Sequence, residues 1–315
     1  MVDATATSGQ PCDLCGSASF EQISSRDRHG KPLATSVCLA CGLVAHAAIP
    51  SEEDLDRYYT SDYRQDYHGE LTPSPRRVMR AWLNGERIHA QLKPYLPEGR
   101  RLLEIGAGIG CTVKVFERAG WNARGIDPNV GFLNYSRERL HSQVTVGGIQ
   151  SLAESESTDV VLLVHVIEHF RSPHAALTRI RSLLPRGGHL YVECPNLAAP
   201  FAPFPKLFHF AHIHNFTPIT LERMAAVCGF RLVQRFGDAR DPNLQMLFAA
   251  DSAATVDFAG GLAATRESLG RAAPIAYHLR PSYLVGRTKK VLGYLREHLS
   301  ARAFVGEIEA RCAAS

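Results

Sequence analysis

The 315-residue sequence lacks the segments that would place a protein in or across a membrane. It contains no run of about 18 apolar residues, the length that a membrane-spanning helix needs. Its first ten residues are polar and lack the apolar core of a signal peptide. No internal repeat is present, and the net charge of +4 is too small to indicate a nucleic-acid partner by itself. We therefore expect a cytoplasmic, globular chain of two or three domains.

The chain contains eight cysteines, which need an explanation in a chain that is not expected to form disulfides. Four of the eight are arranged in two close pairs. The pairs are Cys12 with Cys15 and Cys38 with Cys41, and a glycine follows each pair directly. This spacing is typical of a four-sulfur zinc site, which is closed to substrates and therefore structural. A redox pair and an inert remnant of such a site are the alternatives.

Alternating strand and helix patterns after residue 100 predict an α/β fold with a mostly parallel sheet. Seven strands are expected, and the last two should pair antiparallel because no helix lies between them. We predict a zinc-binding module that forms a small β-ribbon over 1–50, a helical linker or lid over 51–98, the sheet domain over 99–251 and a helical C-terminal extension over 252–315. The expected strands are 101–105, 122–126, 143–147, 159–166, 188–193, 230–236 and 244–250.

A glycine-rich turn follows the first strand of this sheet. The pattern is E-x-G-x-G-x-G, from Glu104 through Gly106 and Gly108 to Gly110, and Asp127 ends the second strand. Glycines let a ligand approach the backbone closely, and a carboxylate at the second strand can bind a ribose diol. The spacing lacks the G-x-G-x-x-G of dinucleotide sites. The alternative for the glycines is a plain tight turn. The alternative for Asp127 is a helix N-cap.

This pattern resembles the first motif of class I S-adenosylmethionine (SAM) methyltransferases. The segment from His165 to His169, Pro185-Arg186-Gly187-Gly188 and Glu193-Cys194-Pro195-Asn196 resemble bacterial members that carry a four-cysteine zinc module. Those enzymes modify sugars, surface polysaccharides or natural products, and the resemblance covers about residues 12–250. It implies a Rossmann-like methyltransferase sheet, SAM as cofactor and a small-molecule acceptor.

The resemblance and the strand order assign the cofactor residues, because ligands of open α/β sheets bind at the carboxyl ends of the strands. Glu104, the three glycines and Asp127 are expected to hold the methionine and ribose parts of SAM. Ile149 and Gln150, after the third strand, are candidates for contact with the adenine. His165 is expected beside the methionine part, with packing as its alternative.

Removal of a proton from the acceptor needs a base with a pKa near the working pH, which favours histidine. We predict His169 as this base, with Glu168 as a neighbour that orients it or holds a metal. Bracing of the next helix is the alternative for both. His212 and His214 are candidates for acceptor contact and Tyr63 for a lid over SAM, with loop structure and packing as alternatives. His209 lies in the same segment, and these three histidines are poor candidates for zinc ligands because no fourth ligand is evident nearby.

Several functions remain compatible with the sequence. A hydroxyl of a sugar, glycan or natural product is the expected acceptor, and a sugar C-methyltransferase is the first alternative. Glu168 and His169 also match two metal ligands of quinone-type O-methyltransferases, although His165 replaces the first carboxylate of that family. An RNA methyltransferase is disfavoured because the zinc module offers few basic side chains. A non-catalytic scaffold is disfavoured by the intact glycines. The basic C-terminal helix fits a homodimer contact, internal packing or an anionic membrane.

Overall fold

The computed structural model describes residues 10–57, 72–96, 100–153, 157–199, 202–279 and 281–314. Its larger sheet has seven strands in the order β10-β11-β8-β7-β4-β5-β6. β4, β5 and β6 pair in parallel, whereas β11 is antiparallel to β8 and to β10. The predicted fold class and its antiparallel last pair are therefore confirmed. The strands are β4 (Arg101–Ile105), β5 (Asn122–Asp127), β6 (Val144–Val146), β7 (Val160–Val164), β8 (His189–Pro195), β10 (Phe230–Phe236) and β11 (Asn243–Ala250).

The chain divides into two compact units, and the division falls inside β7. The first unit contains residues 1–50 and 163–283, and the second contains 51–162 and 284–315. β7 itself is an unbroken apolar run, which is typical of a strand covered on both faces.

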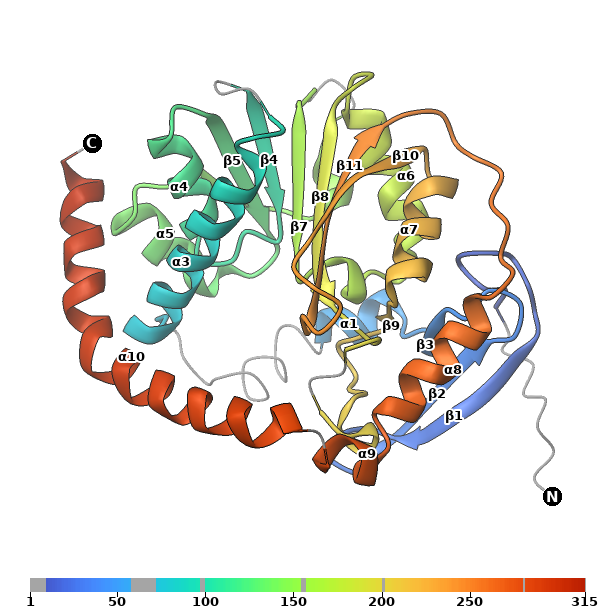
Figure 1. Ribbon diagram of the computed structural model, residues 1–315. Coiled ribbons are helices and arrows are strands. Elements are labelled where there is room, and N and C mark those ends of the chain that lie inside the picture. Colours follow the sequence, from blue (N-terminus) through green and yellow to red (C-terminus); the bar gives the residue numbers. More distant parts are fainter. Residues whose placement is uncertain are drawn as a thin grey trace. The chain divides into compact units, whose positions relative to one another are not determined.

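In the second unit, helices cover the pairing strands β4 and β5 (Figure 1). Val78 and Trp82 of α3 share a buried cluster with Cys111 and Val115 of α4 and with Ile308 of α10. α4 can begin directly after the glycine turn because Gly110 adopts a left-handed conformation. The helices are α1 (Glu52–Arg57), α3 (Pro75–Leu92), α4 (Cys111–Arg118), η2 (Val130–Phe132), α5 (Leu133–Glu138), η3 (Ile149–Ser151) and α10 (Pro281–Ala313).

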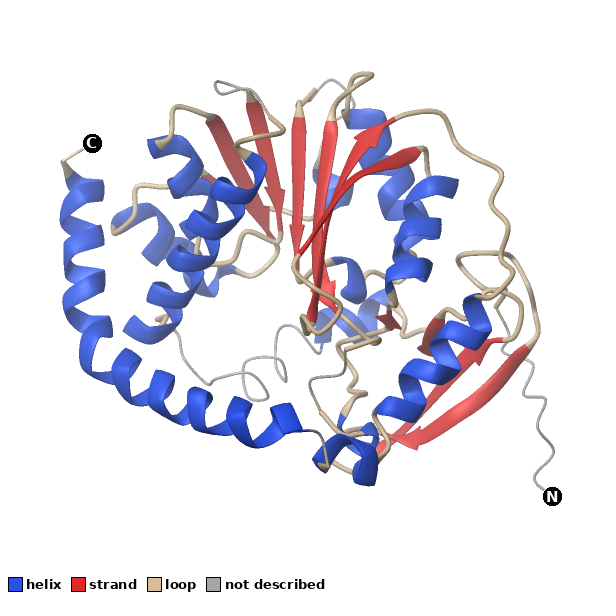
Figure 2. Cartoon of the chain, viewed as in Figure 1, coloured by secondary structure: helices blue, strands red, loops and turns tan. Residues whose placement is uncertain are grey.

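The first unit contains a second, smaller sheet in the order β1-β2-β3-β9 (Figure 2). β1 (Phe20–Arg26), β2 (Pro32–Cys38) and β3 (Val44–His46) come from the four-cysteine module, and β9 (His214–Asn215) joins from far along the chain. The sequence pattern predicted the ribbon but not this fourth strand. β9, which lies far along the chain, therefore adds a fourth strand to the sheet of the four-cysteine module.

Two helices of the first unit, α6 and α7, begin at clear capping signals. Ser172 caps α6 through its side chain, and a proline follows at the first helical position. Thr217 and Thr220 form a capping box at the start of α7. The helices are η4 (Ile167–His169), α6 (Pro173–Leu183), η5 (Phe204–Lys206), α7 (Pro218–Val227), α8 (Gly261–Arg271) and α9 (Pro274–His278). Among the described residues of both units, no helix combines the length and the apolar character needed to cross a membrane.

Candidate functional site

The turn after β4 is held tightly against the end of β5. The backbone amides of Gly106 and Ala107 both donate to the carbonyl of Ile126, at 2.8 and 3.0 Å. At Gly110, φ is +79° and a Cβ would lie 2.4 Å from Oγ of Ser136. Glycine is required there by both backbone conformation and space. The turn therefore has the close backbone approach that the sequence pattern predicted.

Asp127, at the end of β5, is the carboxylate of this turn and is only 8% exposed. Its Oδ2 accepts a hydrogen bond from the Gly108 amide at 2.8 Å, and its Oδ1 accepts one from the Asn129 amide at 2.7 Å. Burial raises the pKa of Asp127, and these two amide hydrogen bonds partly oppose the rise. Each carboxylate oxygen has a further lone pair, so the group can cap the local turn and also accept from a diol.

Glu104, Ile149 and Gln150, which were also predicted for cofactor binding, lie in the same unit, whereas His165 belongs to the first unit. Glu104 is 3% exposed, and its Oε2 has no hydrogen-bond partner in the part of the chain that the structure describes. Burial raises the pKa of Glu104 to about 8, although a hydrogen bond from Thr112 opposes the rise. Ile149 and Gln150 lie on η3 directly after β6, with Ile149 buried and Gln150 exposed. An apolar surface and a solvent-facing amide therefore follow β6, as expected.

In the first unit, polar side chains gather directly after β7. His165 has a φ of +55°, which is rare for a residue other than glycine, and η4 then carries Glu168 and His169. Glu168 is 1% exposed, and neither of its carboxylate oxygens has a hydrogen-bond partner among the described residues. Nδ1 of His169 lies 2.7 Å from the carbonyl of Ala211 and therefore donates to it. In that tautomer Nε2 of His169 carries a lone pair and no hydrogen.

Three imidazole rings surround one oxygen of this buried carboxylate. Oε1 of Glu168 lies 3.5 Å from Nδ1 of His165 and 4.0 Å from Nε2 of both His169 and His212. We call these four residues the histidine–glutamate group. The ligand atoms of Glu168, His169 and His212 all lie within 4.8 Å of one another, which is compatible with one metal ion.

The three histidines in β9 and in the segment just before it have different surroundings. His209 and His212 face one another with ring centroids 3.8 Å apart, whereas Nδ1 of His214 contacts the carbonyl of Phe170 at 3.1 Å. Burial lowers the pKa of all three, to about 3 for His209 and about 4 for His214. It also lowers the pKa of His169, so these imidazoles are neutral near pH 7. The structure thus joins His212 to Glu168 and His169 and places His214 apart.

Glu193 is a site residue to which the sequence analysis assigned no role. It is 2% exposed on β8, and its Oε1 lies 3.8 Å from Nε2 of His165. Tyr191 and Asn243 donate hydrogen bonds to its two oxygens, at 3.1 and 3.2 Å. A carboxylate at the end of an otherwise apolar strand was the available signal, since such a group is costly to bury without partners. Tyr63 lies outside the described residues.

The four paired cysteines converge on one point of the first unit. All four Sγ atoms lie within 4.8 Å of one another, and two pairs, Cys12 with Cys41 and Cys15 with Cys38, are 3.5 Å apart. Hydrogen bonds from two neighbouring thiols lower the pKa of Cys38 to about 2. The glycines after each pair adopt left-handed conformations, as the predicted tight turns require. The donor set and its spacing fit a tetrahedral ion.

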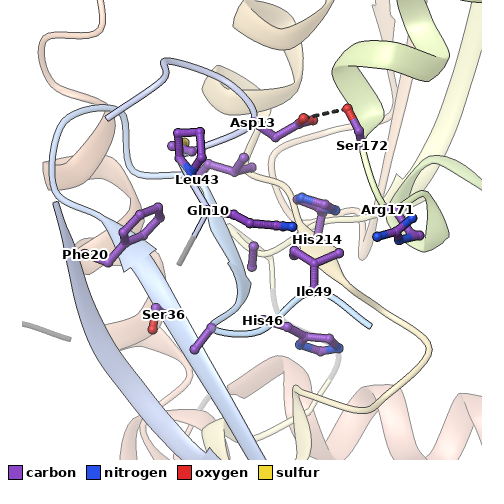
Figure 3. Close-up of a pocket in the computed structure, with 14 residues that line it drawn as sticks. Gln10, Asp13, Phe20, Ser36, Leu43, His46, Ile49, Arg171, Ser172 and His214 are labelled. Atoms are coloured by element: carbon purple, nitrogen blue, oxygen red, sulfur yellow. Dashed lines mark hydrogen bonds between the residues drawn. The ribbon is translucent and has the colours of Figure 1, made fainter. Parts of the chain in front are cut away.

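A cavity of about 250 Å³ lies beside these cysteines in the first unit (Figure 3). Polar groups line much of it, with His46, Arg171 and His214 among them. Oγ of Ser172 donates to Asp13 at 2.6 Å on one side of the cavity. The cavity is near the lower end of the size range of small-molecule pockets.

Comparisons with protein families and with curated proteins both match this chain to methyltransferases. Residues 76–235, just over half of the chain, match the family described as a methyltransferase domain. A ubiquinone biosynthesis O-methyltransferase of Bradyrhizobium sp. (strain ORS 278) is 30% identical over 105 residues, which are 31% of this chain and 41% of that protein. The chain thus spans about two fifths of that curated relative. The enzyme of the same name from Cupriavidus pinatubonensis is 28% identical over 47% of this chain and 67% of its own length.

Solved structures show a similar fold. The 1,6-didemethyltoxoflavin-N1-methyltransferase of Burkholderia thailandensis, solved with 1,6-didemethyltoxoflavin and S-adenosylhomocysteine, has a TM-score of 0.50 to this chain. The two are 18% identical, and the match covers 70% of this chain and 96% of that structure. At this identity the likeness concerns the fold.

The buried Glu104 generates a prediction on stability. Its pKa is about 8 in the folded chain but near 4.3 when unfolded, so the folded state binds an extra proton between these values. The free energy of unfolding should therefore fall as the pH rises from about 5 to about 8. Glu104→Gln, which cannot ionise, should remove most of this slope in urea unfolding, whereas exposed Glu138→Gln should retain it. Parallel curves for Glu104→Gln and the unmodified chain would contradict the prediction.

Proposed function

Because this chain belongs to the methyltransferase-domain family, we propose that it moves a methyl group from SAM to a hydroxyl of a small molecule. The acceptor that we propose is a sugar, glycan or natural product. The observation that carries the proposal is the glycine turn after β4, which is held against β5 and hydrogen-bonded to Asp127. That arrangement offers open backbone and a carboxylate for a nucleoside, and its glycine spacing differs from the G-x-G-x-x-G of pyrophosphate-binding turns.

We propose that Asp127 accepts hydrogen bonds from both ribose hydroxyls of the donor. The two amides that bind its oxygens fix the carboxylate before the ligand arrives, so little ordering is needed on binding. Gly106 and Gly108 leave room for the methionine part, and Ile149 supplies an apolar contact for the adenine. The sulfonium of SAM supplies an activated methyl group, so the protein has to align the reactants and remove one proton.

The proton acceptor that we propose is Nε2 of His169. The hydrogen bond from Nδ1 to the Ala211 carbonyl leaves the lone pair on Nε2, and the nearby Glu168 carboxylate stabilises the imidazolium that forms. The acceptor oxygen forms a bond to the methyl carbon as the carbon–sulfur bond breaks. The electron pair of the broken carbon–sulfur bond stays on sulfur. The hydroxyl proton passes to Nε2. In this scheme His165 lies beside the donor and His214, at the polar cavity, contacts the acceptor. Tyr63 remains a proposed lid residue.

For the four-cysteine module we propose a structural zinc ion. Four sulfur donors close the coordination sphere, so the ion would hold the two turns together and would not meet the substrate. Cysteines used as thiolate ligands favour a reducing compartment such as the cytoplasm. A homodimer through the C-terminal helix also remains a proposal.

A phenolic hydroxyl of a quinone precursor is the second candidate acceptor. The curated relatives that match the chain are named for ubiquinone biosynthesis, and their reaction is also O-methylation. A phenol loses its proton more readily than a sugar hydroxyl, so it makes a smaller demand on the base.

Replacement of Asp127 tests the cofactor assignment. Asp127→Ala removes the acceptor of both ribose hydrogen bonds and should abolish measurable SAM binding in calorimetry. Asp159→Ala is the matched control, because Asp159 is a carboxylate that pairs with Arg101 at the first residue of β4, away from the turn. The control should keep normal affinity. Unchanged SAM affinity in a folded Asp127→Ala protein would overturn the assignment.

Replacement of His169 tests the proposed base. His169→Ala should bind SAM normally but lose turnover by about 10²–10⁴-fold, the range that a general base contributes. The assay measures transfer of labelled methyl groups to a panel of sugar and phenolic acceptors. His174→Ala, an exposed histidine at the start of α6, should retain full turnover. Near-normal turnover without His169 would place the base elsewhere.

Replacement of two cysteines tests the structural ion. In Cys12→Ser, Cys15→Ser the zinc content should fall by one equivalent per chain in elemental analysis, and solubility should fall with it because the turns lose their cross-link. Cys228→Ala, outside the cluster, should keep that equivalent. Equal zinc content in both proteins would refute the proposed site.

A further inference from the structure

One face of the smaller sheet forms the floor of the cavity shown in Figure 3. Ser36, Ala45 and His214 lie directly opposite one another on β2, β3 and β9, so their side chains share that face. All three line the cavity. Because the side chain of Ala45, in the middle of this row, ends at Cβ, the space above the sheet stays open. The cavity of about 250 Å³ is therefore built on regular secondary structure.

Two buried polar groups of this floor are available to a ligand. His214 is 2% exposed, and its Nδ1 donates to the carbonyl of Phe170 at 3.1 Å, so Nε2 of the neutral ring carries a lone pair. Ser36 is 3% exposed. Within the part of the chain that the structure describes, no hydrogen bond reaches Nε2 of His214 or the hydroxyl of Ser36. Buried polar groups are normally hydrogen-bonded, so these two favour a ligand that donates to the histidine and bonds to the serine.

The charged side chains of the lining balance one another and are held by the protein. Asp13 accepts hydrogen bonds from the Ser172 hydroxyl and the His174 amide, at 2.6 and 2.8 Å. Arg171 donates from Nε to the carbonyl of Pro50 at 2.8 Å. One carboxylate and one guanidinium leave no net charge for a ligand to neutralise, and an unpaired charge is costly to bury. The cavity therefore favours a neutral molecule.

Apolar side chains supply the opposite wall. Phe20 lies across the cavity from His214 and Arg171 (Figure 3), and Leu43 and Ile49 add aliphatic surface. A cavity of about 150 Å³ is large enough to bind benzene, so this larger one has room for a six-membered ring with several substituents. A fitting ligand thus presents hydroxyl groups on one side and an apolar face on the other.

We propose that this cavity is a binding site for one neutral sugar ring. Nε2 of His214 accepts a hydrogen bond from one sugar hydroxyl, the Ser36 hydroxyl bonds to a second, and the C–H face of the ring packs on Phe20. A simple phenol fits this lining less well, because its single hydroxyl can reach only one of the two polar groups. A charged sugar, such as a uronic acid, brings a carboxylate for which the lining has no unmatched positive charge.

This sugar site is separate from the proposed centre of methyl transfer. No member of the histidine–glutamate group lines the cavity, so the ring held there is not the one that gives a proton to His169. The two sites are nevertheless close along the chain, because His214 contacts the carbonyl of Phe170, the residue after His169. The ring is then a neighbouring unit of the acceptor, a role that rests on the proposed function, whereas the binding itself does not.

Ligand-observed nuclear magnetic resonance tests the site on zinc-loaded, full-length protein without SAM. The probes are neutral methyl hexopyranosides of gluco, galacto and manno configuration, with catechol and glucuronate as comparators. We expect at least one glycoside to bind with a Kd on the order of 1 mM, as suits a small ligand held by few hydrogen bonds, and neither comparator to match it. Failure of all three glycosides, or tighter binding of catechol or glucuronate, would overturn the proposal.

Three variants of the smaller sheet locate the bound glycoside. Ser36→Ala should weaken binding about 3–10-fold, the value of one net hydrogen bond. Ala45→Ile fills the floor with a residue that strands favour and should weaken it more than about 10-fold. Thr35→Val is the matched control, because Thr35 faces the other side of β2 and its hydroxyl has no partner among the described residues. Equal affinity in all three folded variants would place the glycoside elsewhere and refute the site. The SAM affinity of Asp127→Ala is a separate measurement, so the sugar site and the proposed function can fail independently.

Discussion

The close approach of the chain after β4 to the end of β5 is the contact on which the second unit's site depends. One carbonyl, that of Ile126, accepts from two successive amides, and the next residue along, Gly108, donates to Asp127. Gly125 makes this approach possible, because a Cβ there would lie 2.5 Å from the Cβ of Ala107. A side chain at Gly110 would likewise collide with Ser136. The glycines of the motif thus hold two strands' loops together before any ligand binds.

Each of the two units buries a carboxylate, and the two carboxylates differ in the hydrogen bonds that they receive. Asp127 accepts hydrogen bonds from two backbone amides, which hold its carboxylate in one position. Glu168 is surrounded by imidazoles that do not hydrogen-bond to it. A buried carboxylate without a hydrogen bond from the described residues is costly, so Glu168 is less well compensated than Asp127, which receives two amide hydrogen bonds.

Local sequence signals predicted the sheet well because its strands are short apolar runs with clear punctuation. β4 and β10 have the predicted bounds, whereas β7 begins one residue later than predicted and ends at Val164, because its polar exit, from His165 onward, is no longer strand. The cysteine pairs were likewise predictable, since each pair is local and one glycine closes each turn. The seven-stranded fold and the four-cysteine cluster could therefore be inferred from local patterns alone.

Contacts between distant segments could not be inferred in this way. Nothing in the spacing of His209, His212 and His214 shows that only the middle one reaches Glu168, more than forty residues earlier. The addition of β9 to the module's sheet is equally invisible, because two residues carry no periodic pattern. Glu193 carried a usable signal, a carboxylate ending an apolar strand, but its partner His165 is set by the turn after β7. The tertiary packing of the first unit determines all three features: the contact of His212 with Glu168, the addition of β9 and the contact between Glu193 and His165.

The four-cysteine module is connected directly to the segment that carries the histidine–glutamate group. Asp13, between two of the cysteines, accepts hydrogen bonds from the Ser172 hydroxyl and the His174 amide, at 2.6 and 2.8 Å, where α6 begins. On the other side, β3 pairs with β9, and His214 of that strand donates to the carbonyl of Phe170. The chain just after η4 is therefore fixed at two points by the module and its sheet. A structural ion in the module would act on catalysis in this indirect way, by holding the backbone that positions Glu168 and His169 rather than by touching the substrate.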